Sequence, residues 1–299
     1  MATLRLGLIG AGPWGKICLR AITALEPAMR VSVVASRNPA TTALVACPVF
    51  SEWRDLLSSG LCDAVVVTTP PDSHAEIAVA ALDRGLPVFV EKPLALRPDQ
   101  ARAVRDAALR TGVPVVVDHI HLFSPAFRRL RERVAETGEV VGILGRAGKP
   151  GGRGENVPVL WDWGVHDVAM CLALMGRIPD QATARLVARP TFADGRGEVV
   201  ELDLGFGPVR ASLRLGSLER RQRLFQVTCR QGVLTYDDGA DAKLTLDGRP
   251  MAIGAELPLD VALEEFRARA WDGKPDREGL ELAVAAVDVL ARAEETLAR

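Results

Sequence analysis

The sequence has no surplus of charge of either sign. Its 37 Lys and Arg residues nearly balance 38 Asp and Glu residues, which leaves a formal net charge of −1. Proteins that bind nucleic acids or anionic membrane surfaces usually carry a basic surplus. We therefore expect neither kind of partner.

Cysteine is scarce and scattered. The number of cysteines is odd, and no two of them lie close together in the sequence. Disulfide frameworks and thiolate metal sites need paired or closely spaced cysteines. We therefore expect reduced thiols, a cytoplasmic location and no bound metal. The five residues are Cys18, Cys47, Cys62, Cys171 and Cys229.

Long apolar runs are also absent. None reaches the roughly 20 residues that a membrane-spanning helix requires. The apolar residues 4–9 lead directly into a glycine-rich segment. They therefore predict a first strand rather than a signal peptide.

The glycine-rich segment lies between this strand and a helical pattern over residues 13–25, and a second strand is expected over 31–35. In such a unit the first glycine permits a tight turn, the second lets a pyrophosphate approach the backbone, and the third lets helix and strand pack closely. The helix N-terminus offers free N–H groups to the phosphates. The pattern favours dinucleotide binding over a plain tight turn. The expected contacts are Gly10, Gly12, Pro13, Trp14 and Gly15.

The end of the second strand bears on which dinucleotide is bound. A carboxylate at this point would bind the ribose hydroxyls of NAD. The sequence has Ser36 and Arg37 instead. Arg37 is a permanent cation whose planar donor groups suit a phosphate, and Ser36 can donate a hydrogen bond. We expect NADP(H), with NAD(H) as the alternative.

The next clear strand covers residues 63–68 and ends in a proline-marked turn. Open α/β sheets bind ligands at the carboxyl ends of their strands. The turn is therefore expected beside the cofactor. For the histidine in the following helix, a structural or loop-packing role is favoured over catalysis. The residues concerned are Thr68, Thr69, Pro71 and His74.

A short apolar run over residues 86–90 leads into Glu91-Lys92-Pro93. Pro93 stops the strand because proline has no N–H for the ladder. Glu91 and Lys92 should then lie at the carboxyl end, where ligands bind. The alternative is a solvated strand end with an incidental ion pair.

A helix over residues 98–111 and a strand over 113–117 continue the alternation. Strands that alternate with helices predict right-handed crossovers and a doubly wound parallel sheet. We therefore expect a Rossmann domain over residues 1–121.

Three of these segments match one known family together. They are Gly10–Gly15, the stretch Val65–His74 and the tripeptide Glu91-Lys92-Pro93. In these three segments the chain resembles the Gfo/Idh/MocA family of NAD(P)-dependent oxidoreductases. The resemblance implies a second domain that binds substrate and has one open sheet. The free face of such a sheet is often an oligomer interface, which implies a homodimer or homotetramer.

Residues 122–299 show a different pattern, with several strands joined by short glycine-bearing turns. This predicts an α+β domain with a mostly antiparallel meander. Two helices follow, and the last could pack back on the first domain. The expected strands are 140–146, 182–188, 199–205, 209–215, 224–230, 233–236 and 243–246, and the helices 259–271 and 277–297.

Asp162 and His166 lie four residues apart near the start of a helix expected over residues 165–175. On one helix face, a carboxylate beside an imidazole is a general-base arrangement. A structural cap is the alternative. The family usually carries an aspartate and a histidine at this spacing, which implies a catalytic pair. Many members have a further aspartate where this chain has Ala169, so the role of Asp167 stays open.

Further candidates for substrate contact follow from the resemblance. His119 and His121 fall where family members often have an asparagine and an arginine or aromatic residue near the substrate. Packing in the core is an equal alternative for His119. Trp163 could stack on a sugar face, although packing is the commoner role of tryptophan. The candidate substrate residues are His119, Trp163 and Asp167.

These features lead to a hypothesis of hydride transfer between NADP(H) and a secondary alcohol or its ketone. The substrate would be a small molecule: a sugar, a nucleotide sugar or a similar polyol. Lys92 would stabilise the developing alkoxide, His166 would accept the proton and Asp162 would orient the imidazole. Glu91 would hold Lys92 or the nicotinamide loop in place. Whether Lys92 or His166 is the final proton acceptor stays open, as do the substrate and the direction. The alternatives are the same fold acting on a non-sugar substrate and a catalytically silent dinucleotide sensor.

Overall fold

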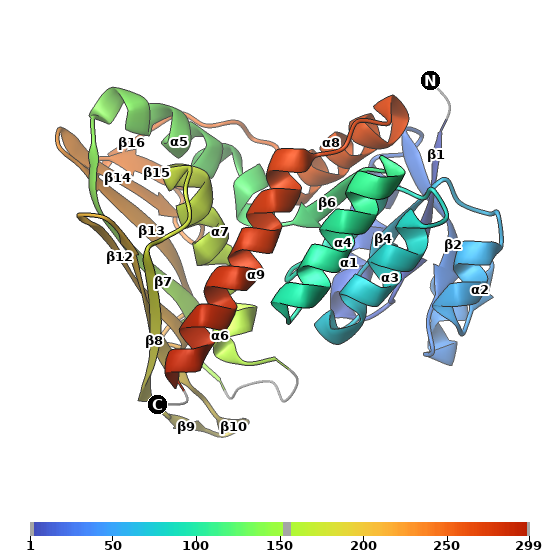
Figure 1. Cartoon of the computed structure of the whole chain (residues 1–299), viewed down its shortest axis with the longest axis horizontal. Helices are drawn as coiled ribbons and strands as arrows, with labels where there is room; N and C mark the ends of the chain where they lie inside the picture. The colour runs from blue at the N-terminus through green and yellow to red at the C-terminus, as the bar shows by residue number, and fades with distance from the viewer. Residues whose placement is uncertain (1–2, 152–156, 298–299) are drawn as a thin grey trace. The chain divides into compact units, whose positions relative to one another are not determined.

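The apolar runs near the start of the chain form a six-stranded parallel sheet in the computed structural model (Figure 1), which describes residues 3–151 and 157–297. The strand order is β3-β2-β1-β4-β5-β6. Every residue of the three strands β4, β5 and β6 is buried, as expected for a sheet covered on both faces. The strands are β1 Leu4–Ile9, β2 Met29–Ala35, β3 Val49–Phe50, β4 Ala64–Val67, β5 Val88–Glu91 and β6 Val115–Asp118.

Helices cover both faces of this sheet. Because the crossovers are right-handed and the strand order runs outward from β1 in both directions, α1 lies on one face and α3 and α4 on the other. Helices α3 and α4 pack side by side (Figure 1). Helix α1 packs against α8. The helices are α1 Pro13–Ala24, α2 Trp53–Ser58, α3 His74–Leu82, α4 Pro98–Thr111 and α8 Pro258–Asp272, with single turns η1 Pro39–Ala43 and η2 Pro71–Ser73.

The chain divides into two compact units, and the first gathers residues from both ends. It comprises the chain up to residue 119 together with 257–284. Helix α8 belongs here because its apolar face is buried, with the Phe266 ring 5.6 Å from that of Phe89 in β5. From the sequence we predicted a boundary after residue 121 and assigned 257–284 to the second domain. The apolar face of a helix does not reveal in the sequence which sheet it will cover.

The second unit comprises residues 120–256 and 285 onward. It has an eight-stranded sheet in the order β16-β15-β14-β13-β7-β12-β11-β8. All pairs are antiparallel except β7 with β12. The predicted fold class is confirmed, but a simple meander is wrong, because β7 inserts between β12 and β13. The strands are β7 Val140–Lys149, β8 Gln181–Ala188, β11 Val199–Phe206, β12 Val209–Ser217, β13 Gln222–Cys229, β14 Gly232–Asp237, β15 Leu244–Leu246 and β16 Arg249–Pro250.

Helices of the second unit pack on one face of this sheet. Along β12 buried and exposed residues alternate, which leaves the other face open. Among the described residues, no helix is both long enough and apolar enough to span a membrane. The remaining elements are η3 Ile120–Phe123, α5 Pro125–Thr137, α6 Val159–Asp162, α7 Gly164–Met175, the small hairpin β9 Thr191–Phe192 and β10 Gly195–Arg196, and α9 Arg277–Leu297, which passes from the first unit into the second.

Candidate active site

The turn after β1 requires glycine. Gly10 has a φ of +100°, and a Cβ at this position would lie 2.8 Å from the carbonyl carbon of Thr68. Side chains rarely tolerate that conformation or that approach. The Thr68 hydroxyl donates a hydrogen bond to the Gly10 carbonyl oxygen at 2.7 Å. The glycine turn is therefore held against the end of β4.

The start of α1 is open to an anion. Gly12 is the N-cap, no side chain caps the helix, and Pro13 occupies the first turn. A Cβ at Gly12 would meet nothing within 4 Å. The space beside the helix start is therefore open, and the first-turn N–H groups of a helix are the groups that bind phosphates.

A pocket of about 380 Å³ lies at the carboxyl ends of β1, β2 and β4. It is lined by six residues that the sequence assigns to the cofactor: Gly10, Gly12, Ser36, Arg37, Thr68 and Thr69. The pocket also contains residues that sequence reasoning missed: Ser51, Glu52, Trp53, Asp72 and Ser73. The short strand β3 could have revealed the first three, because they follow its carboxyl end.

The loop after β2 is ordered by its own polar side chains. The Ser36 hydroxyl accepts hydrogen bonds from the Asn38 backbone N–H at 3.2 Å and from the Thr41 hydroxyl at 2.9 Å. Arg37 is exposed at the pocket. Glu52 and Asp72 place carboxylates in the same pocket. The site therefore offers one guanidinium and two carboxylates to the ribose end of a nucleotide.

These observations fit a dinucleotide. The glycine turn, the uncapped α1 terminus and the adjoining pocket supply a phosphate cradle and an adenosine pocket along one sheet edge. Of the other predicted contacts, Pro71 follows β4, Glu91 ends β5 and Lys92 follows it. All lie at that same edge because the strands are parallel.

His74 joins two loops of the site. Its ring is buried, with Nδ1 2.8 Å from the Pro93 carbonyl oxygen and Nε2 2.8 Å from the Thr69 carbonyl oxygen. A neutral imidazole donates to only one of these carbonyls. Burial lowers the pKa of His74 and outweighs the two carbonyls, which raise it. His74 therefore positions the Lys92–Pro93 loop against the exit of β4.

The predicted substrate residue His119 is buried in the first unit. It retains 3% exposure, and neither ring nitrogen has a hydrogen-bond partner among the described residues. Burial lowers the pKa of His119 to about 4, and the Lys92 charge acts in the same direction. The imidazole is therefore neutral at physiological pH.

The second unit carries the Asp162 and His166 pair on two helices rather than one. Helix α6 ends at Asp162 and α7 begins at Gly164, with Trp163 between them. The expectation of one continuous helix face is therefore corrected. Asp162 is exposed, whereas Trp163 and His166 are half-buried.

His166 lies in an aromatic cluster that sequence reasoning did not assemble. The rings of His121 and His166 meet edge to face at 5.0 Å. His121 Nδ1 lies 2.9 Å from the hydroxyl of Tyr236. Burial raises the pKa of Tyr236, so the phenol stays protonated. No local signal links Tyr236 to a histidine 115 positions away.

Asp167 has a different place from the predicted substrate contact. Its side chain has no exposed surface, and its Oδ2 accepts a hydrogen bond from Arg223 Nη1 at 2.7 Å. Burial raises the pKa of Asp167, and the guanidinium opposes that effect. The prediction is corrected because the carboxylate lies inside the unit, where it ties α7 to β13.

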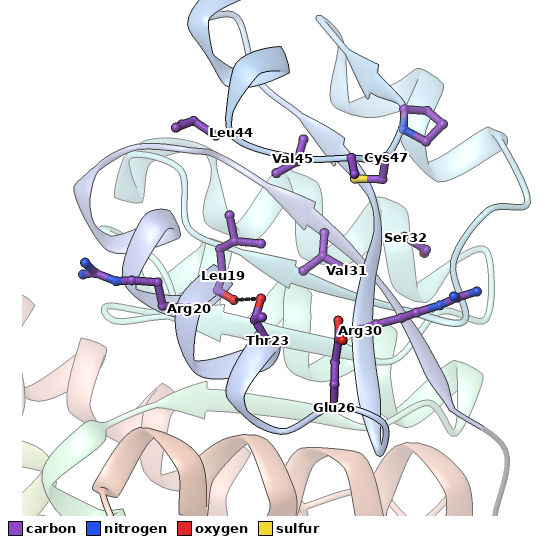
Figure 2. Close-up of a pocket in the computed structure, with 12 residues that line it drawn as sticks. Leu19, Arg20, Thr23, Glu26, Arg30, Val31, Ser32, Leu44, Val45 and Cys47 are labelled. Carbon is purple, nitrogen blue, oxygen red and sulfur yellow. Dashed lines mark hydrogen bonds between the residues drawn. The ribbon is translucent and has the colours of Figure 1, made fainter.

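A second, larger pocket lies elsewhere in the first unit and does not extend this site (Figure 2). It measures about 720 Å³ and borders the amino half of β2, α1 and residues 44–48. Figure 2 shows Arg20 and Arg30 extending to opposite sides, so they do not converge on an anion. Among the described residues, no cluster of three or more His, Cys, Asp or Glu side chains could hold a metal ion.

Comparison with known proteins identifies relatives along the whole chain. Residues 4–119 match the family model described as an oxidoreductase family with an NAD-binding Rossmann fold. A solved structure of a chain named as an oxidoreductase from Magnetospirillum magnetotacticum MS-1 is 39% identical, covers 98% of this chain and 100% of that chain, and has a TM-score of 0.92.

Two curated relatives add to this result. Inositol 2-dehydrogenase 2 of Saccharopolyspora erythraea is 30% identical over 68% of this chain, and the match spans 64% of that relative's length. The rhizopine catabolism protein MocA of Rhizobium meliloti is 28% identical over 100% of this chain and 96% of its own. Together with the glycine cradle and the Glu91-Lys92-Pro93 strand end, these matches show that the chain belongs to the Gfo/Idh/MocA family of NAD(P)-dependent oxidoreductases.

Proposed function

We propose that this protein transfers a hydride between NADP(H) and a secondary alcohol or its ketone in a sugar, a nucleotide sugar or a similar polyol. The observation that carries the proposal is the position of Lys92. It follows β5 at the same sheet edge as the glycine cradle of α1. The inositol dehydrogenase among its relatives supports a cyclic polyol as the first substrate class to test.

The chain supplies the binding and proton-handling groups. The dinucleotide, when bound, accepts or donates the hydride. The Lys92 ammonium stabilises negative charge on the substrate oxygen as the hydroxyl loses its proton. His166 accepts that proton, because an imidazole titrates near neutral pH, and Asp162 orients the ring. His74 keeps the Lys92 loop in place through the Pro93 carbonyl.

Substitution of the two proton-handling residues tests the proposal. We expect Lys92→Ala and His166→Ala each to lower kcat by about 100-fold or more, with NADPH still bound in a fluorescence titration. Lys274→Ala, at an exposed position outside the site, is the matched control. Unchanged turnover of inositol, sugars and nucleotide sugars in both variants would overturn the proposal. Tight cofactor binding with no turnover across that panel would favour a dinucleotide sensor, and turnover of a non-sugar alcohol alone would favour the other alternative.

The preference for NADP(H) rests on Arg37, which lines the pocket where a carboxylate would favour NAD. We expect Arg37→Ala to weaken NADPH binding by about ten-fold and leave NADH binding nearly unchanged, because one charge-assisted contact to the phosphate is lost. Equal weakening of both cofactors would show that Glu52 and Asp72 determine the choice instead.

We also propose that the protein forms a homodimer or homotetramer. The open face of the second sheet carries a half-exposed Leu144, and Glu201 forms ion pairs there with Arg185 and Arg214. A homodimer or homotetramer through this face accounts for an open sheet with an apolar residue at its centre. Light scattering of the wild type and of Leu144→Asp tests it, with a monomeric wild type as the contrary result. The five cysteines are free thiols, which supports a cytoplasmic location.

A further inference from the structure

Two carboxylic acids end neighbouring strands in the first unit. Glu91 is the last residue of β5 and Asp118 the last of β6, and they are register partners in a parallel pair. Partners in adjacent strands project from the same face of a sheet, with backbones about 5 Å apart. Glu91 is 8% exposed and Asp118 is 0% exposed. Two acidic side chains therefore lie next to each other inside the protein.

The surroundings offer these acids little neutralising charge. Lys92 follows Glu91, and the neutral His119 follows Asp118. From α1, Trp14 and Cys18 face the pair, and α8 contributes apolar side chains such as Phe266. The other nearby titratable group is the buried His74 on α3, which senses the Lys92 charge.

Hydrogen bonding compensates only in part for this burial. Neither oxygen of Asp118 accepts a hydrogen bond of ordinary geometry from a described residue, and the buried indole N–H of Trp14 has no acceptor. Burial raises the pKa of Glu91 well above its ordinary range, and the Asp118 carboxyl raises it further. Burial raises the pKa of Asp118 to about 6, while weak hydrogen bonding from the Glu91 carboxyl, the Lys92 charge and weak hydrogen bonding from the Trp14 indole N–H lower it.

Like charges at this separation in a low-dielectric interior do not both ionise. The pair must then lose its protons in two steps that belong to both residues together. Between these two steps one carboxyl is ionised and the other keeps its proton. The pair thus carries a single negative charge next to Lys92.

We infer that Glu91 and Asp118 share one proton at neutral pH and act as positioning residues for Lys92. The inference deepens the proposed function and rests on it for the role of Lys92. When the pair carries its single negative charge, it holds the ammonium at the sheet edge. When the pair takes up its second proton in acid, that attraction is lost and the ammonium is less well positioned.

Carboxyl-carbon NMR titration of the cofactor-free protein tests the shared proton without any assay of activity. We expect the pair to give a carboxyl signal with a midpoint near pH 6, and Asp118→Asn to remove it. In that variant the Glu91 midpoint should fall by about one pH unit or more, because its like-charged neighbour is gone. Asp63→Asn, at the opposite end of β4, is the matched control and should leave both signals unchanged.

An unchanged Glu91 midpoint in Asp118→Asn, or ordinary midpoints for both acids, would overturn the shared proton. If the two midpoints are coupled but the protein oxidises no alcohol, the proposed function fails, whereas the shared proton of Glu91 and Asp118 is upheld.

The pH profile of kcat tests the positioning role, with inositol and NADP⁺ as the probe. We expect an acidic limb that Asp118→Asn displaces by about one pH unit or more while KM for NADP⁺ stays within about two-fold. Asp118→Glu should restore part of the limb. A purely structural role would lower Tm in Asp118→Asn and leave the limb in place, which would overturn the positioning role.

Discussion

Asp118 in the first unit and Asp167 in the second are both fully buried, but their neighbours differ. Asp118 faces another carboxyl group across two strands, and Asp167 faces the guanidinium of Arg223 at 2.7 Å. A buried acid must either keep a proton or acquire a counter-charge. The first unit uses a proton, which pH can remove, whereas the second uses an arginine, which pH does not affect. The comparison separates an acid whose charge changes with pH from one whose charge is compensated by an arginine and that ties a helix to a sheet.

The largest effect should come from removing the counter-charge. Arg223→Met leaves Asp167 buried without its partner, and we expect a loss of about 3–5 kcal/mol in the free energy of unfolding. Urea denaturation measures it. The double variant Asp167→Leu with Arg223→Met should recover much of the loss, because both charges are then gone. A loss below about 1 kcal/mol in the single variant would show that the ion pair does not hold the second unit together.

A smaller effect should appear at His119, which contributes a pH dependence opposite to that of Asp118. The pKa of His119 is about 4 in the folded protein and about 6.5 when unfolded. The folded state therefore binds fewer protons between these values, and its stability falls as pH decreases through them. Between about pH 7.5 and 4.5 the wild type loses free energy of unfolding, and His119→Gln should remove about 2–3 kcal/mol of that loss. Urea titrations at the two pH values measure it. If the variant loses as much stability in acid as the wild type, the His119 imidazole would have to be charged in the folded protein.

Asp118 itself should show the reverse sign. Its pKa of about 6 in the folded protein exceeds the unfolded value of about 3.9. The folded state therefore binds more protons, and stability falls as pH rises through this window. The free energy of unfolding of Asp118→Asn, relative to that of the wild type, should therefore increase by about 2 kcal/mol as the pH rises from about 4.5 to 7.5. Asp167→Asn should instead lose stability at neutral pH, because it strands the Arg223 charge. If both variants changed stability in the same direction at neutral pH, the two buried acids would not differ in the way that they are compensated.

The smallest effect is expected at the open face of the second sheet. Glu201 pairs with Arg185 and Arg214 where solvent reaches all three side chains. We expect Glu201→Gln to change the free energy of unfolding by less than about 1 kcal/mol, and less at high salt. A loss as large as that of Arg223→Met would mean that this face is covered in solution.

Much of the cofactor half of the site is predictable from sequence because its signals are local. The turn at Gly10 needs a positive φ, and Pro93 stops β5 wherever the chain goes afterwards. The same reasoning failed for Asp167, since no sequence signal distinguishes a carboxylate that reaches a substrate from one that reaches an arginine 56 positions away. It also missed Trp53 in the cofactor pocket, which depends on where the two-residue strand β3 joins the sheet.

The sequence by itself determined the order of strands and helices, the glycine cradle and the placement of Lys92 at a strand end. These depend on hydrophobic period, backbone sterics and the missing N–H of proline, which act over a few residues. Only the tertiary structure decided that Glu91 meets Asp118, that Tyr236 reaches His121 and that α8 joins the first unit. Those outcomes depend on strand register and burial, which set the charge of each buried acid and arise only when distant segments pack.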